Sequence, residues 1–261
     1  MARASELLFV DPSVPDLGTI LRNLRPEVEA IVLDRAPPAR QMAAALEGRD
    51  GLDAVHVIAH GVPGRVGFAA GEWTAGTLQD DEADLAAIGH ALGSTGDLLL
   101  WSCEAGAGAA GQGFVDGLSH ATRAQIAAAS DLIGSRTLGG VWELNISKGD
   151  ATARPPLTME GMMSYAAVLA AIEITVSGLI PNGSTPGSTT YFVVDREHST
   201  IVGNLNLPTM AMANKPFRIT LKVPSGSTSV DVGIFEGGEF ISAGFTVDVP
   251  APPSGAVGPK E

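Results

Sequence analysis

The sequence is organised around residues 98–106, which read LLLWSCEAG. The apolar run at 98–101 predicts a buried strand, and a small-residue segment with a helical pattern follows it. Cys103, the one cysteine of the chain, therefore lies where a strand gives way to a loop and a helix. Ligands and reactive groups gather at the carboxyl ends of strands in open α/β sheets. This position argues against reading Cys103 as a small buried hydrophobe.

A second strand of the same design lies upstream. Residues 54–59 read AVHVIA and run into His60 and Gly61, so we expect an imidazole and a thiol at the same sheet edge. A nearby imidazole can lower the pKa of a thiol and accept its proton, which makes the sulfur a nucleophile toward a carbonyl. We expect His60 and Cys103 to be the catalytic pair. The backbone N–H groups of Gly61 and Cys103 would then stabilise the oxyanion.

The bulk composition excludes several classes of protein. The formal net charge is −13 and lysine and arginine form no cluster, so the chain lacks the basic surface with which proteins bind nucleic acid. No run approaches the roughly 18 apolar residues of a membrane span, and the apolar stretch at 7–10 is too short for a signal peptide. One cysteine allows no intrachain disulfide, which fits a reducing compartment. We expect a soluble, cytoplasmic protein, and the alanine and glycine content suggests a bacterial source.

Alternating strand and helix patterns predict the fold of the first part of the chain. This alternation indicates an α/β domain over residues 1–170, with a mostly parallel sheet flanked by helices. A hairpin is expected at 66–74. Thr158 is expected to cap a last helix whose methionines lie in the core. The apolar positions of that helix would be Met159, Met162, Met163, Ala166 and Leu169. Strands are expected at 6–10, 28–33, 54–59, 98–101, 125–129 and 141–146.

The character of the sequence changes near residue 170. From 171 to 250, short alternating strands are separated by clusters of glycine, proline, serine and threonine, which predicts a small all-β sandwich domain. Residues 251–261 are rich in proline and glycine and are expected to form a disordered tail. The strands of the sandwich are expected at 173–176, 190–194, 217–223, 229–235 and 240–249.

Two other chemistries fit parts of the same region. The dinucleotide-binding pattern G-x-G-x-x-G occurs at Gly106, Gly108 and Gly111. Asp131 lies where such a site has an acidic residue, but three residues separate the strand end from the first glycine, which argues against it. His56, His60 and Cys103 could bind zinc, yet no fourth ligand is evident. The sequence therefore predicts neither a metal nor an organic cofactor.

Four blocks of the sequence carry a family resemblance: LDAVHVIAHG at 52–61, GDLLLWSC at 96–103, AAAS at 127–130 and GGVWEL at 139–144. The first two resemble the histidine and cysteine signatures of caspases, gingipains, separase and related clan CD cysteine peptidases. Over residues 6–169 the sequence is also similar to a caspase-like bacterial domain of unknown function that occurs near the start of giant surface repeat proteins. The resemblance implies a caspase-haemoglobinase fold, with His60 as base and acid and Cys103 as nucleophile.

The resemblance also bears on specificity. Arg-specific relatives often carry aspartate two residues before the nucleophile, and here that position is Trp101. This route to a preference for basic residues is therefore absent. Trp101 itself could line the specificity pocket. Asp131, at the end of the next predicted strand, could also line that pocket, or it could simply cap a loop.

These patterns favour a caspase-like cysteine endopeptidase that cleaves a specific protein partner or itself. Its substrate would be a protein or peptide, and an activating protein partner could bind through the β domain. The first alternative is a catalytically silent caspase-fold domain that serves as a binding or scaffold module. A dinucleotide-binding domain is the second alternative.

Overall fold

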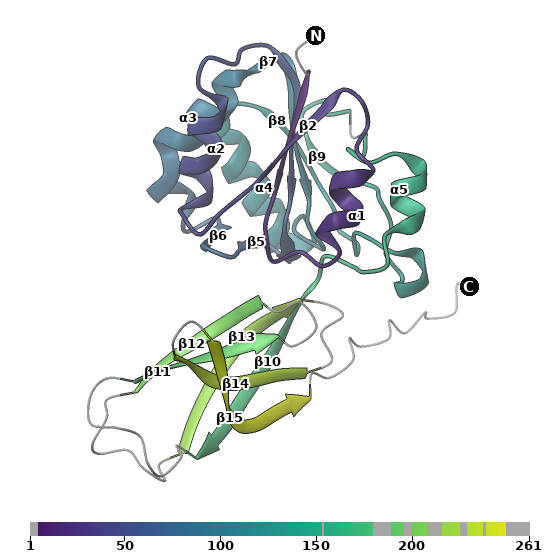
Figure 1. Cartoon of the computed structure of the whole chain (residues 1–261). Helices are drawn as coiled ribbons and strands as arrows, with labels where there is room; N and C mark the ends of the chain where they lie inside the picture. The colour runs from purple at the N-terminus through teal and green to yellow at the C-terminus, as the bar shows by residue number, and fades with distance from the viewer. Residues whose placement is uncertain are drawn as a thin grey trace. The chain divides into compact units, whose positions relative to one another are not determined.

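The chain folds into two compact units, Met1–Ala170 and Ala171–Glu261, in the computed structural model (Figure 1). His60 and Cys103 both lie in the first unit. The structure describes residues 5–152, 154–179, 189–195, 200–207, 216–224, 229–236 and 239–248.

The first unit is built on a six-stranded sheet. Its strands are β1 (Glu6–Val10), β2 (Val28–Val32), β3 (Leu52–Ile58), β7 (Leu92–Trp101), β8 (Gln125–Ala128) and β9 (Ile146–Lys148). They are arranged in the order β2-β1-β3-β7-β8-β9. All neighbours pair in parallel except β8 and β9, which are antiparallel. The predicted α/β fold with a mostly parallel sheet is confirmed.

Helices cover both faces of this sheet (Figure 1). One face carries the longer helices, α2 (Pro38–Leu46), α3 (Glu82–Ala91) and α4 (Gly108–Thr122), and the other carries α1 (Leu17–Arg22) and α5 (Met159–Ser164). Leu7 and Phe9 of β1 are buried under the longer helices, and Leu8 and Val10 are buried on the opposite face. Successive strand residues point to opposite faces, so a strand that is apolar throughout needs cover on both. None of the described helices is long and apolar enough to cross a membrane.

A small antiparallel sheet follows β3. It comprises β4 (His60–Val62), β5 (Arg65–Phe68) and β6 (Gly71–Thr74), in that order. The pairing of β5 with β6 confirms the predicted hairpin. The sequence did not indicate β4, which begins at His60, because three residues are too few to show an alternation.

The predicted strand at 141–146 is wrong for most of its length, because pairing with the sheet begins only at Ile146 in β9. Val141 is held by the loop that follows β8 instead. Its N–H donates to the Leu132 carbonyl oxygen at 2.8 Å, and its own carbonyl oxygen accepts from the Gly134 N–H at 3.2 Å. Backbone hydrogen bonds to this loop take the place of the sheet ladder.

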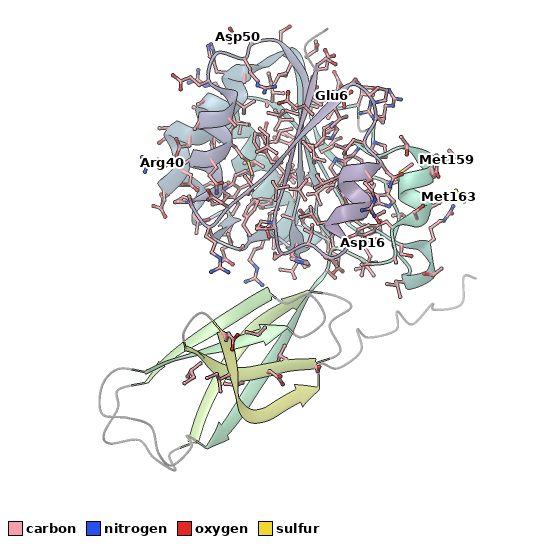
Figure 2. All side chains as sticks on the ribbon, viewed as in Figure 1. Glu6, Asp16, Arg40, Asp50, Met159 and Met163 are labelled. Carbon is pink, nitrogen blue, oxygen red and sulfur yellow. The ribbon has the colours of Figure 1, made fainter. Side chains whose placement is uncertain are left out.

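α5 begins as predicted but turns an unexpected face to the core. The Thr158 hydroxyl oxygen accepts a hydrogen bond from the Gly161 N–H at 3.1 Å and caps the helix. Gly161 packs so closely on the end of α1 that a Cβ would lie 2.4 Å from the Asn23 Cβ. With this face inward, Met159 and Met163 are 74% and 81% exposed and point outward (Figure 2). The prediction that these two methionines lie in the core is therefore wrong.

The predicted last helix also ends early. α5 stops at Ser164, so Ala166 and Leu169 lie outside it. The Leu169 N–H donates to the Ile133 carbonyl oxygen at 2.9 Å. This tertiary hydrogen bond replaces the one that a longer helix would have made.

The second unit consists of β-strands in its described part. They are β10 (Ala171–Leu179), β11 (Thr189–Asp195), β12 (Thr200–Leu207), β13 (Pro216–Pro224), β14 (Ser229–Glu236) and β15 (Glu239–Asp248). β10 pairs with β13, and the others form an antiparallel sheet in the order β12-β11-β14-β15. The sequence did not indicate β12. The sandwich arrangement stays a prediction, and the predicted tail at 251–261 lies outside the described residues.

Gly89→Ala should destabilise the first unit. A Cβ at Gly89 in α3 would lie 1.7 Å from the Thr122 carbonyl oxygen at the end of α4, so the helices must move apart at a cost of about 1–3 kcal/mol. Gly113→Ala in α4 is the matched control, because nothing lies within 4 Å of its Cβ position. It should stabilise the unit by about 0.5–1 kcal/mol. Urea unfolding followed by tryptophan fluorescence measures both, and equal stability of the two variants would contradict this helix packing.

Candidate functional site

The two strand ends that the sequence singled out meet at one edge of the sheet. Ile58 ends β3 and pairs with Trp101, the last residue of β7. Beyond them, Gly61 packs on the backbone of Cys103. A Cβ at Gly61 would lie 2.3 Å from the Cys103 carbonyl oxygen and 2.8 Å from its nitrogen. Only a residue without a Cβ allows this approach, which brings the segments of His60 and Cys103 together.

The His60 side chain is buried and held through one ring nitrogen. Its Nε2 lies 3.1 Å from the Ser13 carbonyl oxygen, and its Nδ1 has no hydrogen-bond partner among the described residues. Because a carbonyl oxygen only accepts, Nε2 carries the hydrogen of the neutral ring and Nδ1 carries the lone pair. Nδ1 is therefore the nitrogen that can accept a proton.

Burial lowers the pKa of His60 below its usual value. The hydrogen bond to Ser13 and the charge of Asp11 oppose this effect. Weaker polar interactions with the backbone of Leu169 and Ala170 act in the same direction as Ser13 and Asp11. Burial has the larger effect, so the ring is held in the neutral form, which is the form that a general base requires.

Asp11 organises the turn that presents Ser13 to His60. It is buried, and its Oδ1 accepts from the Ser13 N–H at 2.9 Å while its Oδ2 accepts from the Ala69 N–H at 2.7 Å. The sequence analysis identified neither Asp11 nor Ser13. No motif could reveal Ser13, because it acts through a backbone carbonyl, which every residue carries.

The Cys103 thiol is fully buried and bonded to the backbone of Ile133. Its Sγ accepts a hydrogen bond from the Ile133 N–H at 3.1 Å and donates to the Ile133 carbonyl oxygen at 3.5 Å. Burial raises the pKa of Cys103 to about 12, although backbone groups of Ile133 and Leu169 act to lower it. The expectation that a neighbouring imidazole lowers this pKa does not hold in the described conformation, because loss of solvent outweighs the polar contacts.

A segment of the chain itself covers the site. Residues 167–170 follow α5, and both Val168 and Leu169 are buried. The Gly61 N–H, which the sequence marked as an oxyanion donor, donates to the Leu169 carbonyl oxygen at 3.1 Å. This donor therefore already holds a peptide carbonyl.

The two predicted specificity residues lie in different environments. Trp101 is fully buried, and its Nε1–H donates to the Nδ1 of His56 at 3.0 Å. Trp101 also belongs to the same apolar cluster as Leu169. Asp131 is exposed, and its Oδ2 accepts from the side-chain amide of Asn145 at 2.7 Å. Trp101 thus belongs to the core, whereas Asp131 bonds to a side chain of a neighbouring loop, and a role of either residue in specificity stays a prediction.

Both ring nitrogens of His56 have hydrogen-bond partners outside the candidate site. Its Nε2 lies 2.7 Å from the Glu6 carboxylate, and its Nδ1 accepts from an indole. Burial lowers the pKa of His56. Burial raises the pKa of Glu6, but hydrogen bonds from His56 and Arg25 outweigh it and lower that pKa to about 2. The zinc site considered from the sequence thus loses a ligand, and no group of three metal-binding side chains occurs within the described part of the chain.

The glycine-rich segment packs tightly around the start of α4. A Cβ at Gly111 would lie 2.0 Å from the Gly106 carbonyl carbon, and a Cβ at Gly106 would lie 2.9 Å from the Ile146 Cβ. Gly108 opens the helix with a φ of 62°, a conformation that favours glycine. These contacts account for the three glycines without a nucleotide.

Comparisons with known proteins identify a family. A family model described as a domain of unknown function (DUF4347) matches residues 7–169. No curated protein matches the sequence. The crystal structure of a GH3 β-glucosidase from Bifidobacterium adolescentis aligns with 94% of this chain and 49% of its own, at 11% sequence identity and a TM-score of 0.21. A TM-score of that size supports no conclusion about fold or function.

The intact chain should resist alkylation of its cysteine. With a pKa of about 12 and full burial, Cys103 should react with iodoacetamide near pH 8 at least about 100-fold more slowly than a free thiol of pKa about 8.5. The chain has one cysteine, so intact-protein mass spectrometry reads the label directly. The same chain in guanidinium chloride is the control and should label as a free thiol does. Equal rates in buffer and denaturant would contradict the burial of the thiol.

Proposed function

We propose that this chain, which belongs to the DUF4347 family, is a caspase-like cysteine peptidase with His60 and Cys103 as its catalytic pair. The description of the family assigns no activity. The observation that supports this best is the packing of Gly61 on the Cys103 backbone at the carboxyl edge of the sheet. This packing joins the segments that carry an imidazole, a thiol and a backbone donor, which are the groups that acyl transfer requires. The mostly parallel sheet flanked by helices is compatible with the caspase-haemoglobinase fold that the sequence signatures suggest.

Each group has a defined role in this proposal. The Ser13 carbonyl holds the Nε2 of His60, so that Nδ1 accepts the proton of the Cys103 thiol. The sulfur attacks a peptide carbonyl, and the N–H groups of Gly61 and Cys103 stabilise the oxyanion that forms. His60 then protonates the leaving amine, and water hydrolyses the thioester.

The described conformation is a resting one in this proposal. The raised pKa of Cys103 keeps the thiol protonated, so attack requires that His60 remove the proton as the new bond forms, or that the covering segment move. The substrate is a protein or peptide, and a protein partner bound to the second unit could supply the trigger. We place the protein in the cytoplasm, where a thiol nucleophile stays reduced.

A catalytically silent scaffold is the second candidate function. The complete burial of Cys103 favours it, since a buried cysteine often serves as a small hydrophobe. The unpartnered Nδ1 of His60 speaks for the peptidase. A buried polar atom without a partner costs free energy, and in the peptidase this atom would accept the thiol proton.

A peptide library made from a digested proteome tests the peptidase proposal, with new amino termini read by mass spectrometry. Cleavage by Cys103→Ala and by His60→Ala should each fall at least about 100-fold below wild type, because proton transfer by a positioned side chain contributes at least that much. The double variant should lie within about ten-fold of the single variants, because the two residues act as a unit.

His120→Ala is the matched histidine control for the library experiment. His120 is exposed on α4, away from the segments that carry His60 and Cys103, so this variant should cleave at the wild-type rate. Equal cleavage by wild type, Cys103→Ala and His60→Ala would reject the peptidase proposal and leave the scaffold as the better account.

A further inference from the structure

The segment that covers the candidate site is held as an added β-strand would be. The Ser135 N–H donates to the Ala167 carbonyl oxygen at 2.8 Å, and the Leu169 N–H donates to the Ile133 carbonyl oxygen at 2.9 Å. Hydrogen bonds from alternate backbone positions are the way in which proteins bind extended peptides. The loop after β8 therefore binds residues 167–169 through the same kind of backbone hydrogen bonds that hold an extended peptide.

A glycine in the loop after β8 makes room for this segment. Gly134 has a φ of 133°, and a Cβ there would lie 2.3 Å from the Ala167 carbonyl oxygen and 2.8 Å from the Val168 Cα. On the other side, Gly61 and Ala170 form a parallel bridge. A side chain at Gly134 would occupy the space that the segment fills.

The Leu169 carbonyl is bound by the predicted oxyanion donor. Its oxygen accepts from the Gly61 N–H at 3.1 Å, within the range that an oxyanion donor needs. The Leu169 backbone also interacts with the Cys103 thiol. The backbone of Leu169 and Ala170 interacts with the His60 ring. The Gly61 donor thus holds the Leu169 carbonyl, and the backbone of Leu169 lies close to both the thiol and the imidazole.

The side chain before that bond lies in an apolar core cluster. Leu169 is fully buried and belongs to the cluster that holds Trp101, Ile133 and Trp142. A charged side chain at this position would lose its hydration without gaining a partner in this cluster. The surroundings therefore suit an apolar residue on the amino side of the bond.

From these contacts we propose that the chain cleaves itself between Leu169 and Ala170. The inference rests on the proposed peptidase function and names its substrate, a segment of this chain with an apolar residue before the bond. Cleavage separates residues 1–169 from residues 170–261, and therefore divides the chain one residue before the boundary between its two compact units.

The reaction consumes one water. The Cys103 sulfur bonds to the Leu169 carbonyl carbon while the thiol proton passes to the Nδ1 of His60, and the Gly61 N–H holds the negative oxygen. The bond from that carbon to the Ala170 nitrogen breaks, and His60 gives its proton to the amine. Water then attacks the thioester, which leaves a carboxyl group on Leu169 and restores the thiol.

Intact-protein mass spectrometry of the purified full chain tests this inference. Wild type should convert to the fragments 1–169 and 170–261, with a new carboxyl group on Leu169 and a new amine on Ala170. Cys103→Ala should keep the mass of the whole chain over the same time.

A pair of proline variants tests the assigned bond. Ala170→Pro places a ring carbon on the leaving nitrogen and should slow conversion at least about 100-fold, because small displacements of the reacting groups cost that much. Ala166→Pro is the matched control four residues upstream. Ala166 is exposed, and Tyr165 before it has a φ of −69° and a ψ of 120°, a conformation that a following proline favours. This control should be cleaved at the wild-type rate.

Three outcomes would overturn the inference: an intact wild-type chain, cleavage at a different bond, or equal cleavage of Cys103→Ala. The peptide library separates these failures from a failure of the proposed function. Cleavage of the library by a preparation whose Leu169–Ala170 bond stays whole rejects self-cleavage and keeps the peptidase. Loss of both activities rejects both proposals.

Discussion

The backbone contact between Gly61 and Cys103 is the constraint on which the site depends. Because a Cβ at Gly61 would lie 2.3 Å from the Cys103 carbonyl oxygen, the turn after β3 can approach the turn after β7 only with glycine at this position. That approach sets the spacing between the imidazole and thiol segments. It also leaves the Gly61 N–H free of the six-stranded sheet and available to the Leu169 carbonyl.

The burial of the site also lowers the reactivity of its two side chains. Burial lowers the pKa of His60 and raises that of Cys103, so both groups are held neutral. Residues 167–170 contribute to this burial. Their backbone is hydrogen-bonded to the loop after β8 and to Gly61. In the proposed peptidase, the contacts that would position a peptide for attack therefore also keep the thiol from other electrophiles.

Much of the fold could be predicted because its signals are local. Continuous apolar runs predicted the strands that are buried on both faces, and the pattern at 66–74 predicted the hairpin that β5 and β6 form. The errors share one cause, which is competition from tertiary contacts. Met159 and Met163 follow a helical spacing, yet both are exposed, because α5 packs on Asn23 through the face that carries Gly161.

The residues of the candidate site also differ in how far the sequence could predict them. The histidine and cysteine at two strand ends, and the glycine beside the histidine, could be identified from the sequence because parallel strands share a carboxyl edge. Asp11 and Ser13 could not, because a turn closed by one carboxylate presents a backbone carbonyl that has no sequence signature.

By itself, the sequence determined the α/β class, the change of character near residue 170 and the residue types at the sheet edge, since periodicity and turn chemistry act over a few neighbouring positions. Only the tertiary structure decided the ionisation of Cys103 and the path of Leu169. A pKa depends on which groups exclude water from the thiol. The extended course of residues 165–170 depends on hydrogen bonds to loops more than thirty positions upstream, which no local pattern encodes.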